Sequence, residues 1–327
     1  MEFRKVQKTG GSTYIISLPK EWALKNNIKD GDILTIKENE NGHLIIAKEI
    51  SEREIQKEIE LNVKKESEDL ILRKLIALYL NGFNTIRVYT DSITDEIKNA
   101  IMKFTTLSLG VEIVEETNRY FLLQDLSKFS DLPMEKILQR LYIMTENMLI
   151  DTKNLFNNFN ENLAKDIMDR DTQIDRLFWL ISKQFYTALK NNSILKDQGL
   201  DITRAFNIRS IAKLFERIGD HSVGISSTMV EYKLQNGKII LPYFDKVLDI
   251  FKNSYLSYKT LDIDLANNVV ENSHKFHNDV KNLLNELEKK KIKDISSISS
   301  IFESLIRIAM YSADLSEITI DEKMSNL

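Results

Sequence analysis

The sequence has no cysteine among its 327 residues, which excludes disulfides, thiolate zinc sites, iron–sulfur clusters and cysteine nucleophiles. Any metal ion must therefore be held by oxygen or imidazole ligands. Only three prolines and ten glycines interrupt the chain, which favours long helices. No apolar run approaches the roughly 18 residues that a membrane-spanning helix needs, and the start carries no secretory signal. We therefore expect a cytoplasmic protein with no membrane insertion.

The length and charge of the chain limit its organisation and its partners. A chain of 327 residues predicts two or three domains, and a hydrophobic content of 43% indicates packed globular structure rather than disorder. The formal net charge is −4. Binding to nucleic acid would therefore need a local basic patch, because the chain as a whole is acidic.

Residues 1–48 are rich in strand and turn patterns. A Gly10–Gly11 turn separates two short strands, Pro19 opens a short helix that runs to about Asn26, and two more strands follow a turn at Asp30–Gly31. A β unit of this size buries little surface by itself. We therefore expect a second copy of the chain to complete its core.

Residues 50–127 alternate between helix and strand patterns. They open with a charged connector over residues 49–61, and helices are predicted near 66–81 and 93–107. The predicted strands cover residues 85–90, 111–116 and 119–126. This alternation indicates a small α/β domain. It contains no phosphate-binding glycine loop and no catalytic constellation, so we interpret it as a linker or ligand-sensing module.

Residues 131–327 have helical periodicity almost throughout. The first helix begins with an acidic residue and a proline, near 131–156. Five long helices are predicted to follow, near residues 160–190, 203–232, 243–259, 262–288 and 293–320. The short connections predict antiparallel bundles.

The helical region contains an internal repeat, which predicts two sets of three helices over residues 131–232 and 240–321. Residues 163–181 resemble residues 265–284 at an offset of 102, whereas "FERIGDHSVGIS" resembles "LIRIAMYSADLS" at an offset of 90. The difference falls in the segment "NNSILKDQGLD", which is long in the first copy and nearly absent in the second. A loop deletion accounts for both offsets.

The first copy carries two pairs of acids, Asp171 with Asp175 and Glu216 with Asp220. Residues four apart lie on one face of a helix, so two such faces can bring four carboxylates together. Close carboxylates repel unless they are protonated or bound to a cation, and oxygen ligands suit Mg, Mn, Ca or Fe. The alternative is a solvated acidic face, because charged residues are mostly exposed.

The second copy lacks these acids. Its aligned positions are Ser273, His277, Ile306 and Met310. Gly219 of the first copy corresponds to Ala309, so the glycine and the acids disappear together, as expected if they serve one site. Arg217 has a counterpart in Arg307 and is retained, which indicates a structural role.

The acidic segments "RSIAKLFERIGDHSVGIS" and "DRDTQID" resemble the paired metal-binding helices of PhoU-type phosphate-uptake regulators. The resemblance covers about residues 131–327. It implies two three-helix bundles and a multinuclear site for iron or a divalent ion, carried here by Asp171, Asp175, Glu216 and Asp220. Because the second copy departs from the motif at all four positions, we expect one metal-bearing bundle and one structural bundle.

The N-terminal segments "GGSTYIISLPKEWALKNNIKDGDILTI" and "GHLIIAKE" resemble the AbrB/SpoVT family. The resemblance implies a swapped-hairpin homodimer that binds DNA. Residues 1–29 hold six basic and two acidic residues, a local charge of +4, so phosphate contacts would weaken with salt. The expected DNA-contacting residues are Arg4, Lys5 and Lys8, with Thr9 and Ser12 adding hydroxyl contacts. The alternative is a solvated basic face on a domain that only dimerises.

The fusion of these two parts resembles an archaeal-type PhoU homologue with an AbrB-like head. The leading hypothesis is a metal-binding, DNA-binding transcriptional regulator of phosphate uptake. The alternative is an adaptor that binds no DNA and regulates a phosphate transporter or kinase by contact. We do not expect an enzyme, because the helical half lacks the Glu-x-x-His pattern of di-iron proteins and shows no nucleophile–base pair.

Overall fold

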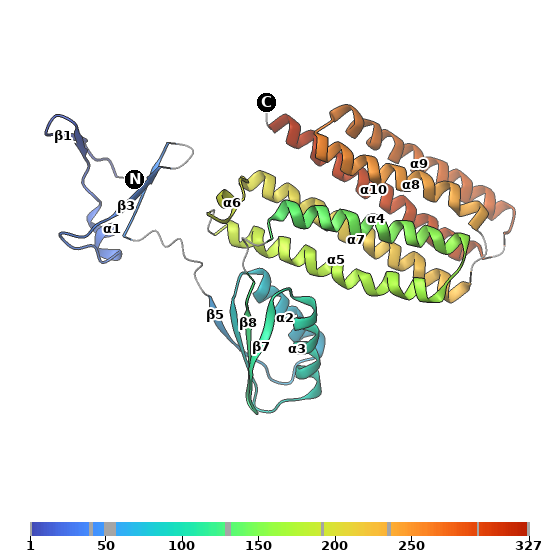
Figure 1. Ribbon diagram of the computed structural model, residues 1–327, viewed down its shortest axis with the longest axis horizontal. Helices are drawn as coiled ribbons and strands as arrows, with labels where there is room; N and C mark the ends of the chain where they lie inside the picture. The colour runs from blue at the N-terminus through green and yellow to red at the C-terminus, as the bar shows by residue number, and fades with distance from the viewer. Residues whose placement is uncertain are drawn as a thin grey trace. The chain divides into compact units, whose positions relative to one another are not determined.

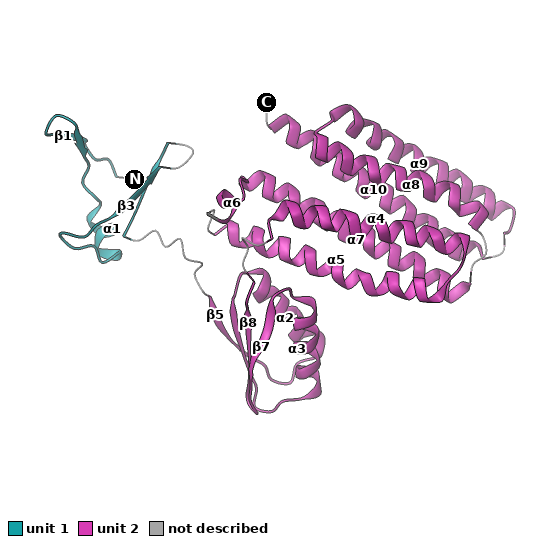
Figure 2. Cartoon of the chain, viewed as in Figure 1, with its two compact units in different colours: residues 1–55 teal, residues 56–327 magenta. Residues whose placement is uncertain are grey.

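The computed structural model describes residues 2–38, 42–48, 57–127, 132–190, 193–233, 237–292 and 294–325. The chain divides into two compact units, residues 1–55 and 56–327 (Figure 2). A β-rich N-terminal region, a small α/β region and a long helical region follow one another, which confirms the predicted fold class. Residues 49–56 of the predicted connector, and Asp131 at the predicted start of the helical region, lie outside the described residues.

The N-terminal unit is built from two short hairpins and one short helix. Its elements are β1 (Gln7–Thr9), β2 (Thr13–Ile15), α1 (Lys20–Lys25), β3 (Thr35–Glu38) and β4 (Leu44–Ala47). Strands β1 and β2 pair antiparallel, as do β3 and β4. Gly10 and Gly11 adopt φ of 61° and 83° in the predicted turn, a region that glycine enters without steric cost. Helix α1 begins directly after Pro19, as predicted.

The α/β region places two helices on one face of a four-stranded sheet (Figure 1). Its elements are β5 (Glu58–Asn62), α2 (Glu68–Leu80), β6 (Thr85–Tyr89), α3 (Asp95–Leu107), β7 (Val111–Glu116) and β8 (Tyr120–Asp125). The strand order is β5-β6-β8-β7, with β5 parallel to β6 and β8 antiparallel to both its neighbours. Alternate residues of β6 and β8, such as Val88 and Leu123, are buried against Ile71 and Phe104 of the helices.

Strand β5 begins inside the segment that the sequence predicts to be a charged connector, so that prediction is wrong for residues 58–61. Ile59 and Leu61 are half-buried, whereas Glu58 and Glu60 are exposed. The charges therefore occupy only one face of the strand, and the other face packs on the domain core. An alternating pattern of this kind is typical of an edge strand with one solvated face.

The helical region contains long helices in two sets of three. The first set is α4 (Met134–Asn157), α5 (Glu161–Ala188) and α7 (Ile202–Tyr232), and the second is α8 (Gly237–Thr260), α9 (Ile263–Lys289) and α10 (Ile295–Ser325). The side chains of Asn160, Asp201 and Asp262 cap α5, α7 and α9 by accepting backbone N–H groups. No helix in the described part of the chain is both long and apolar enough to cross a membrane.

Two helix boundaries differ from the sequence-based expectation. A short helix, α6 (Ser193–Asp197), forms within the long loop of the first copy. Helix α8 begins at Gly237 rather than near residue 243, and Pro242 lies inside it. The early turns are packed, because Ile240 is fully buried and a Cβ on Gly237 would lie 2.4 Å from the carbonyl oxygen of Phe156. This packing holds the helix despite the backbone hydrogen bond that the proline removes.

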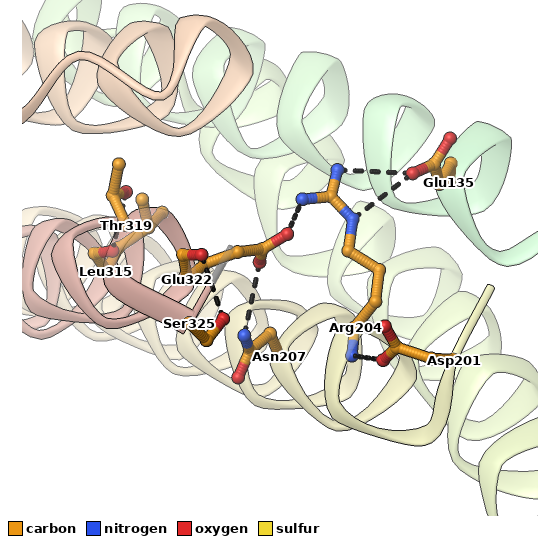
Figure 3. A network of polar contacts seen from close by, with 8 residues as sticks. All are labelled: Glu135, Asp201, Arg204, Asn207, Leu315, Thr319, Glu322 and Ser325. Carbon is orange, nitrogen blue, oxygen red and sulfur yellow. Dashed lines mark hydrogen bonds and ion pairs between the residues drawn. The ribbon is translucent and has the colours of Figure 1, made fainter. Parts of the chain in front are cut away.

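A network of polar contacts joins the two sets of helices (Figure 3). Arg204 of α7 forms an ion pair with the buried Glu322 of α10, and Asn207 donates to the same carboxylate with 3.1 Å between Nδ2 and Oε2. Arg204 also donates from Nη2 to Oε1 of Glu135 on α4 at 3.1 Å. The start of α7 is thereby fixed to the end of α10.

The α/β region is fixed to α5. Lys183 of α5 forms an ion pair with Asp125 at the end of β8, and both side chains are buried. The Lys183 ammonium also lies 4.4 Å from the centre of the Tyr79 ring of α2. Nearby, a Cβ on Gly82 would approach Oγ1 of Thr187 to 2.9 Å. One helix therefore carries both the contact with the α/β region and the predicted metal ligands Asp171 and Asp175.

Candidate metal centre and DNA-binding surface

The four predicted metal ligands lie on two helices that pack against each other. Asp171 and Asp175 belong to α5, and Glu216 and Asp220 belong to α7. Burial and the charges of Asp220 and Glu216 raise the pKa of Asp171 to about 6. Burial and the other three carboxylates raise the pKa of Asp175 to about 7, although the charge of Lys213 opposes this rise. The fold thus brings the two acid pairs into electrostatic contact.

Gly219 allows α5 to approach α7 closely at this cluster. A Cβ on Gly219 would lie 3.2 Å from Cδ1 of Ile174 and 3.5 Å from Oδ1 of Asp171. A Cβ on Gly224, five residues further along α7, would lie within 4 Å of no other atom in the described part of the chain, apart from its chain neighbours and the backbone of its own helix. A glycine destabilises a helix by about 1 kcal/mol relative to alanine. Of these two glycines, only Gly219 lies where the two helices pack closely.

Lys213 supplies a positive charge to the cluster. Its Nζ lies 2.5 Å from both carboxylate oxygens of Glu216, which is 9% exposed. The ammonium also lies 4.9 Å from the centre of the Phe178 ring on α5. Partial burial raises the pKa of Asp220, while the charges of Lys213 and Arg217 lower it. Sequence reasoning missed Lys213, although its spacing of three residues from Glu216 is typical of a helical ion pair.

The donor chemistry of this cluster fits a hard cation. Oδ1 of Asp171 is buried, and no group among the described residues forms a hydrogen bond with it. Buried carboxylate oxygens are costly without a proton or cation. Within the described ranges, however, no three His, Asp or Glu side chains are grouped closely enough to hold a metal ion as they lie. The Glu216 oxygens already contact the Lys213 ammonium, so coordination by all four acids requires these side chains to move.

The second copy has an apolar interior at the corresponding place. Ser273 is fully buried and donates within its own helix to the carbonyl of Val269 at 2.8 Å. Ile306 and Met310 are half-buried, and His277 is exposed. None of these four side chains is an acid, and the structural role of this bundle stays a prediction.

Arg217, which has an arginine counterpart in the second copy, takes part in the contact between α7 and α10. Arg217 donates from Nη1 to the Tyr311 hydroxyl of α10 at 3.3 Å. The ring of His221 lies 5.9 Å from the ring of Tyr311, centre to centre. Burial and the charges of Arg307 and Arg217 lower the pKa of His221. These contacts agree with a structural assignment for Arg217.

The predicted DNA-contacting residues all lie on the exposed surface of the N-terminal unit. Lys8 and Thr9 belong to β1, and Ser12 lies in the following turn, so these three are close together on one hairpin. Arg4 and Lys5 precede β1. Arg4 forms an ion pair with Glu2 at 2.5 Å, which offsets part of its charge.

Apolar side chains of the N-terminal unit are exposed. None of its described residues is buried, and Phe3, Tyr14 and Ile33 are 88%, 71% and 90% exposed. A folded domain needs a buried apolar core to offset its conformational entropy. The described residues of this unit do not form such a core within one chain.

Two family models match the chain. Residues 138–229 match the PhoU domain, and residues 7–54 match the family described as antidote-toxin recognition MazE, bacterial antitoxin. The first match contains all four acids of the candidate metal centre, and the second contains Lys8, Thr9 and Ser12. No curated protein matches the chain.

Two solved structures are similar to the chain. PhoU from Pseudomonas aeruginosa is 17% identical, with a TM-score of 0.53, over 61% of this chain and 98% of that one. The phosphate transport system regulatory protein PhoU from Streptococcus pneumoniae is 15% identical, with a TM-score of 0.48, over 61% and 98%. The likeness to the first shows that the helical region has a PhoU-like fold. The assignment to an archaeal type stays a prediction.

Proposed function

We propose that this chain is a DNA-binding regulator of phosphate uptake whose first helical bundle binds a metal ion. The observation that carries the proposal is the presence, in one chain, of a PhoU-like helical fold and a MazE/AbrB-like domain with an exposed basic hairpin. The N-terminal domain would bind DNA, and the helical region would report phosphate status through the metal or through contact with transporter components.

DNA binding is supported by the chemistry of the first hairpin. Lys8 can contact a phosphate through its charge, and the hydroxyls of Thr9 and Ser12 can donate to phosphate oxygens. Arg4 and Lys5, just before the hairpin, add positive charge to the same segment. Contacts of this kind supply affinity that falls as salt rises, because each neutralised phosphate releases counterions.

A homodimer is supported by the exposed apolar side chains of the N-terminal unit. Side chains such as Phe3, Tyr14 and Ile33 need a partner surface. A second copy presents the same surface and can complete the core by interleaving its hairpins. The two basic hairpins would then bind DNA as a symmetric pair.

Metal binding is supported by the acid cluster on α5 and α7. Asp171, Asp175, Glu216 and Asp220 would hold a divalent ion or iron, and the ion would offset the repulsion among their carboxylates. Binding would require Lys213 to leave Glu216. The cation would then stabilise the packing of α5 on α7 around Gly219.

The DNA-binding part is tested by measuring affinity for promoter DNA of phosphate-transport genes at several salt concentrations. The double variant Lys5→Ala and Lys8→Ala should bind more weakly, and the salt slope should fall by about 1 for each lost phosphate contact. Lys98→Ala, an exposed lysine of α3, is the matched control and should leave both quantities unchanged. Absence of DNA affinity in the unmodified protein at low salt would overturn the proposal.

The link to phosphate is tested by genome-wide DNA occupancy in phosphate-replete and phosphate-starved cells. We expect occupancy at phosphate-transport promoters that changes with phosphate supply. Occupancy that ignores phosphate would retain DNA binding but remove the sensing role. Capture of a phosphate transporter without any promoter occupancy would favour the adaptor that binds no DNA.

A further inference from the structure

Three segments of the α/β region meet at one end of its sheet and form a cavity. Strands β5 and β6 end there and β8 begins there, because β5 is parallel to β6 and β8 runs antiparallel. The register pairs Asn62 with Tyr89, and Tyr89 with Tyr120. The cavity has a volume of about 280 Å³, and its lining includes Asn62, Lys64, Tyr89, Thr90, Asp91 and Arg119. Ligand sites often occur outside the carboxyl ends of parallel strands.

Two basic side chains line this cavity. Lys64 and Arg119 are exposed, and neither forms an ion pair with any carboxylate in the part of the chain that the structure describes. The backbone around Arg119 is ordered, because the N–H groups of Arg119 and Tyr120 donate to Oγ1 of Thr117 at 3.2 and 3.1 Å. A lysine and an arginine that converge on one cavity favour an anionic group such as phosphate.

A pair of tyrosines lies beside the basic side chains. The ring centres of Tyr89 and Tyr120 are 5.3 Å apart. Both side chains lie on the sheet face opposite α2 and α3, because the alternate residues Val88 and Phe121 point into the core. The Tyr120 hydroxyl donates to Glu115 at 2.6 Å, which holds its ring. The Arg87 guanidinium lies 5.3 Å from the centre of the Tyr120 ring, so Tyr89, which lines the cavity, is the ring that can stack against a planar group.

Further polar groups complete the lining. Asp91 is exposed and can accept hydrogen bonds from ligand hydroxyls. Thr90 donates through its hydroxyl to the carbonyl of Ser92 at 2.8 Å, and its N–H donates to the carbonyl of Arg119 at 2.9 Å. The loop after β6 is thereby tied to the hairpin that carries Arg119. Positively charged side chains, a hydrogen-bond acceptor and an aromatic ring therefore line one cavity.

We propose that this cavity binds a mononucleotide. Lys64 and Arg119 bind its phosphate, Tyr89 stacks on its base, and Asp91 accepts from the ribose hydroxyls. The cavity volume of about 280 Å³ lies just below the range of about 300–1,000 Å³ for small-molecule sites, so the site would take a ligand no larger than one nucleotide. This site goes beyond DNA binding and metal binding, because none of its residues belongs to either surface.

Strand β8 runs from the site to the contact with the helical region. Strand β8 begins at Tyr120 beside the cavity and ends at Asp125, which forms the buried ion pair with Lys183 of α5. The nucleotide site is therefore at the opposite end of β8 from the contact with the bundle. This arrangement leaves the cavity accessible while the α/β region remains docked on α5.

Titration calorimetry of the full-length protein with AMP and, separately, with inorganic phosphate tests the proposal. Arg119→Ala should weaken AMP binding by about 10- to 100-fold, as expected for the loss of a hydrogen bond between charged groups. Tyr89→Ala should weaken AMP binding by about 10-fold through lost stacking and leave phosphate binding unchanged. Lys98→Ala is an exposed basic control in the same region and should bind AMP like the unmodified protein.

Three results would overturn the proposal. The first is no AMP binding by the unmodified protein at millimolar concentration. The second is equal AMP affinity in Arg119→Ala and Lys98→Ala, with unchanged thermal midpoints showing that both variants are folded. The third is equal affinity for AMP and inorganic phosphate with no effect of Tyr89→Ala, because the base then makes no contact. Loss of DNA binding in Lys5→Ala and Lys8→Ala affects none of these readings.

Discussion

The two helical copies have the same arrangement of three long helices but opposite chemistry at their centres. Where α5 and α7 carry four acids, α9 and α10 carry Ser273, His277, Ile306 and Met310. The first copy contains a glycine at the close approach, and the second contains the buried Ala309. The same backbone arrangement therefore accommodates either a charged cluster or an apolar contact.

This difference indicates how the four acids affect the stability of the folded protein. The raised pKa values of Asp171 and Asp175 show that their ionised forms are disfavoured in the folded protein. The apolar copy avoids that cost. Under the proposed metal binding, a bound cation would offset that cost. The second copy contacts the first through α7 and α10.

Breaking the polar network that joins the two helical copies should have the largest effect on stability. Glu322→Ala removes the buried partner of Arg204 and Asn207 and leaves the guanidinium without its buried counter-charge. We expect the free energy of unfolding to fall by about 3–5 kcal/mol, measured by urea denaturation. Glu135→Ala, at the exposed end of the same network, should cost less than about 1 kcal/mol. Equal losses in the two variants would contradict the importance of the buried link.

The close approach in the first copy should give the next largest effect. Gly219→Leu places a side chain against Ile174 and Asp171 and forces α5 away from α7. We expect a loss of about 1–3 kcal/mol in the free energy of unfolding. Gly224→Leu is the matched control on the same helix and should gain up to about 1 kcal/mol from helix propensity. A gain in stability from Gly219→Leu would show that this glycine has no packing role.

Local periodicity was enough to predict the fold class and the pairing of the acids. The 3.6-residue pattern located the long helices, and the spacing of four residues placed each acid pair on one face. The repeat identified Ile306 and Met310 as the apolar counterparts of Glu216 and Asp220. Each of these inferences uses residues that are close in sequence or related by one fixed offset.

Pairs of residues that lie far apart in the sequence produce no such periodic pattern. Arg204 and Glu322 are 118 residues apart, and Asp125 and Lys183 are 58 apart, so only the fold brings them together. Strand β5 was not predicted because the glutamates that alternate with Ile59 and Leu61 give this segment the composition of a charged linker. The cavity beside Tyr89 was not predicted because its lining comes from three separate segments of the chain.

The acids of the first copy should make the free energy of unfolding depend on pH. Asp175 has a folded pKa of about 7, against an unfolded value of about 3.9, so the folded state binds the proton more tightly. The stability of the metal-free protein should therefore fall as pH rises from about 4 to 7. Asp175→Asn should raise the free energy of unfolding at pH 7.5 by about 1–3 kcal/mol in the presence of a chelator.

The same measurement at pH 5 should give a smaller gain from Asp175→Asn, because the unmodified carboxyl is then mostly protonated in the folded state. His277→Asn, at the aligned and exposed position of the second copy, should change stability by less than about 0.5 kcal/mol at either pH. A loss of stability in Asp175→Asn at pH 7.5 would mean that the carboxylate is favourably paired without a metal.

Replacing Lys213, the lysine beside the acids of the first copy, should give the smallest effect. This effect can be measured only when a metal ion is added. Lys213 contacts both oxygens of Glu216, so a metal ion must compete with its ammonium for that carboxylate. Lys213→Met retains most of the apolar stem and removes the charge, and we expect it to bind Mn²⁺ about 10-fold more tightly by titration calorimetry. Lys246→Met, in the second copy, is the control and should leave Mn²⁺ affinity unchanged, because Lys246 lies outside the acid cluster. Unchanged affinity in Lys213→Met would show that Glu216 takes no part in holding the ion.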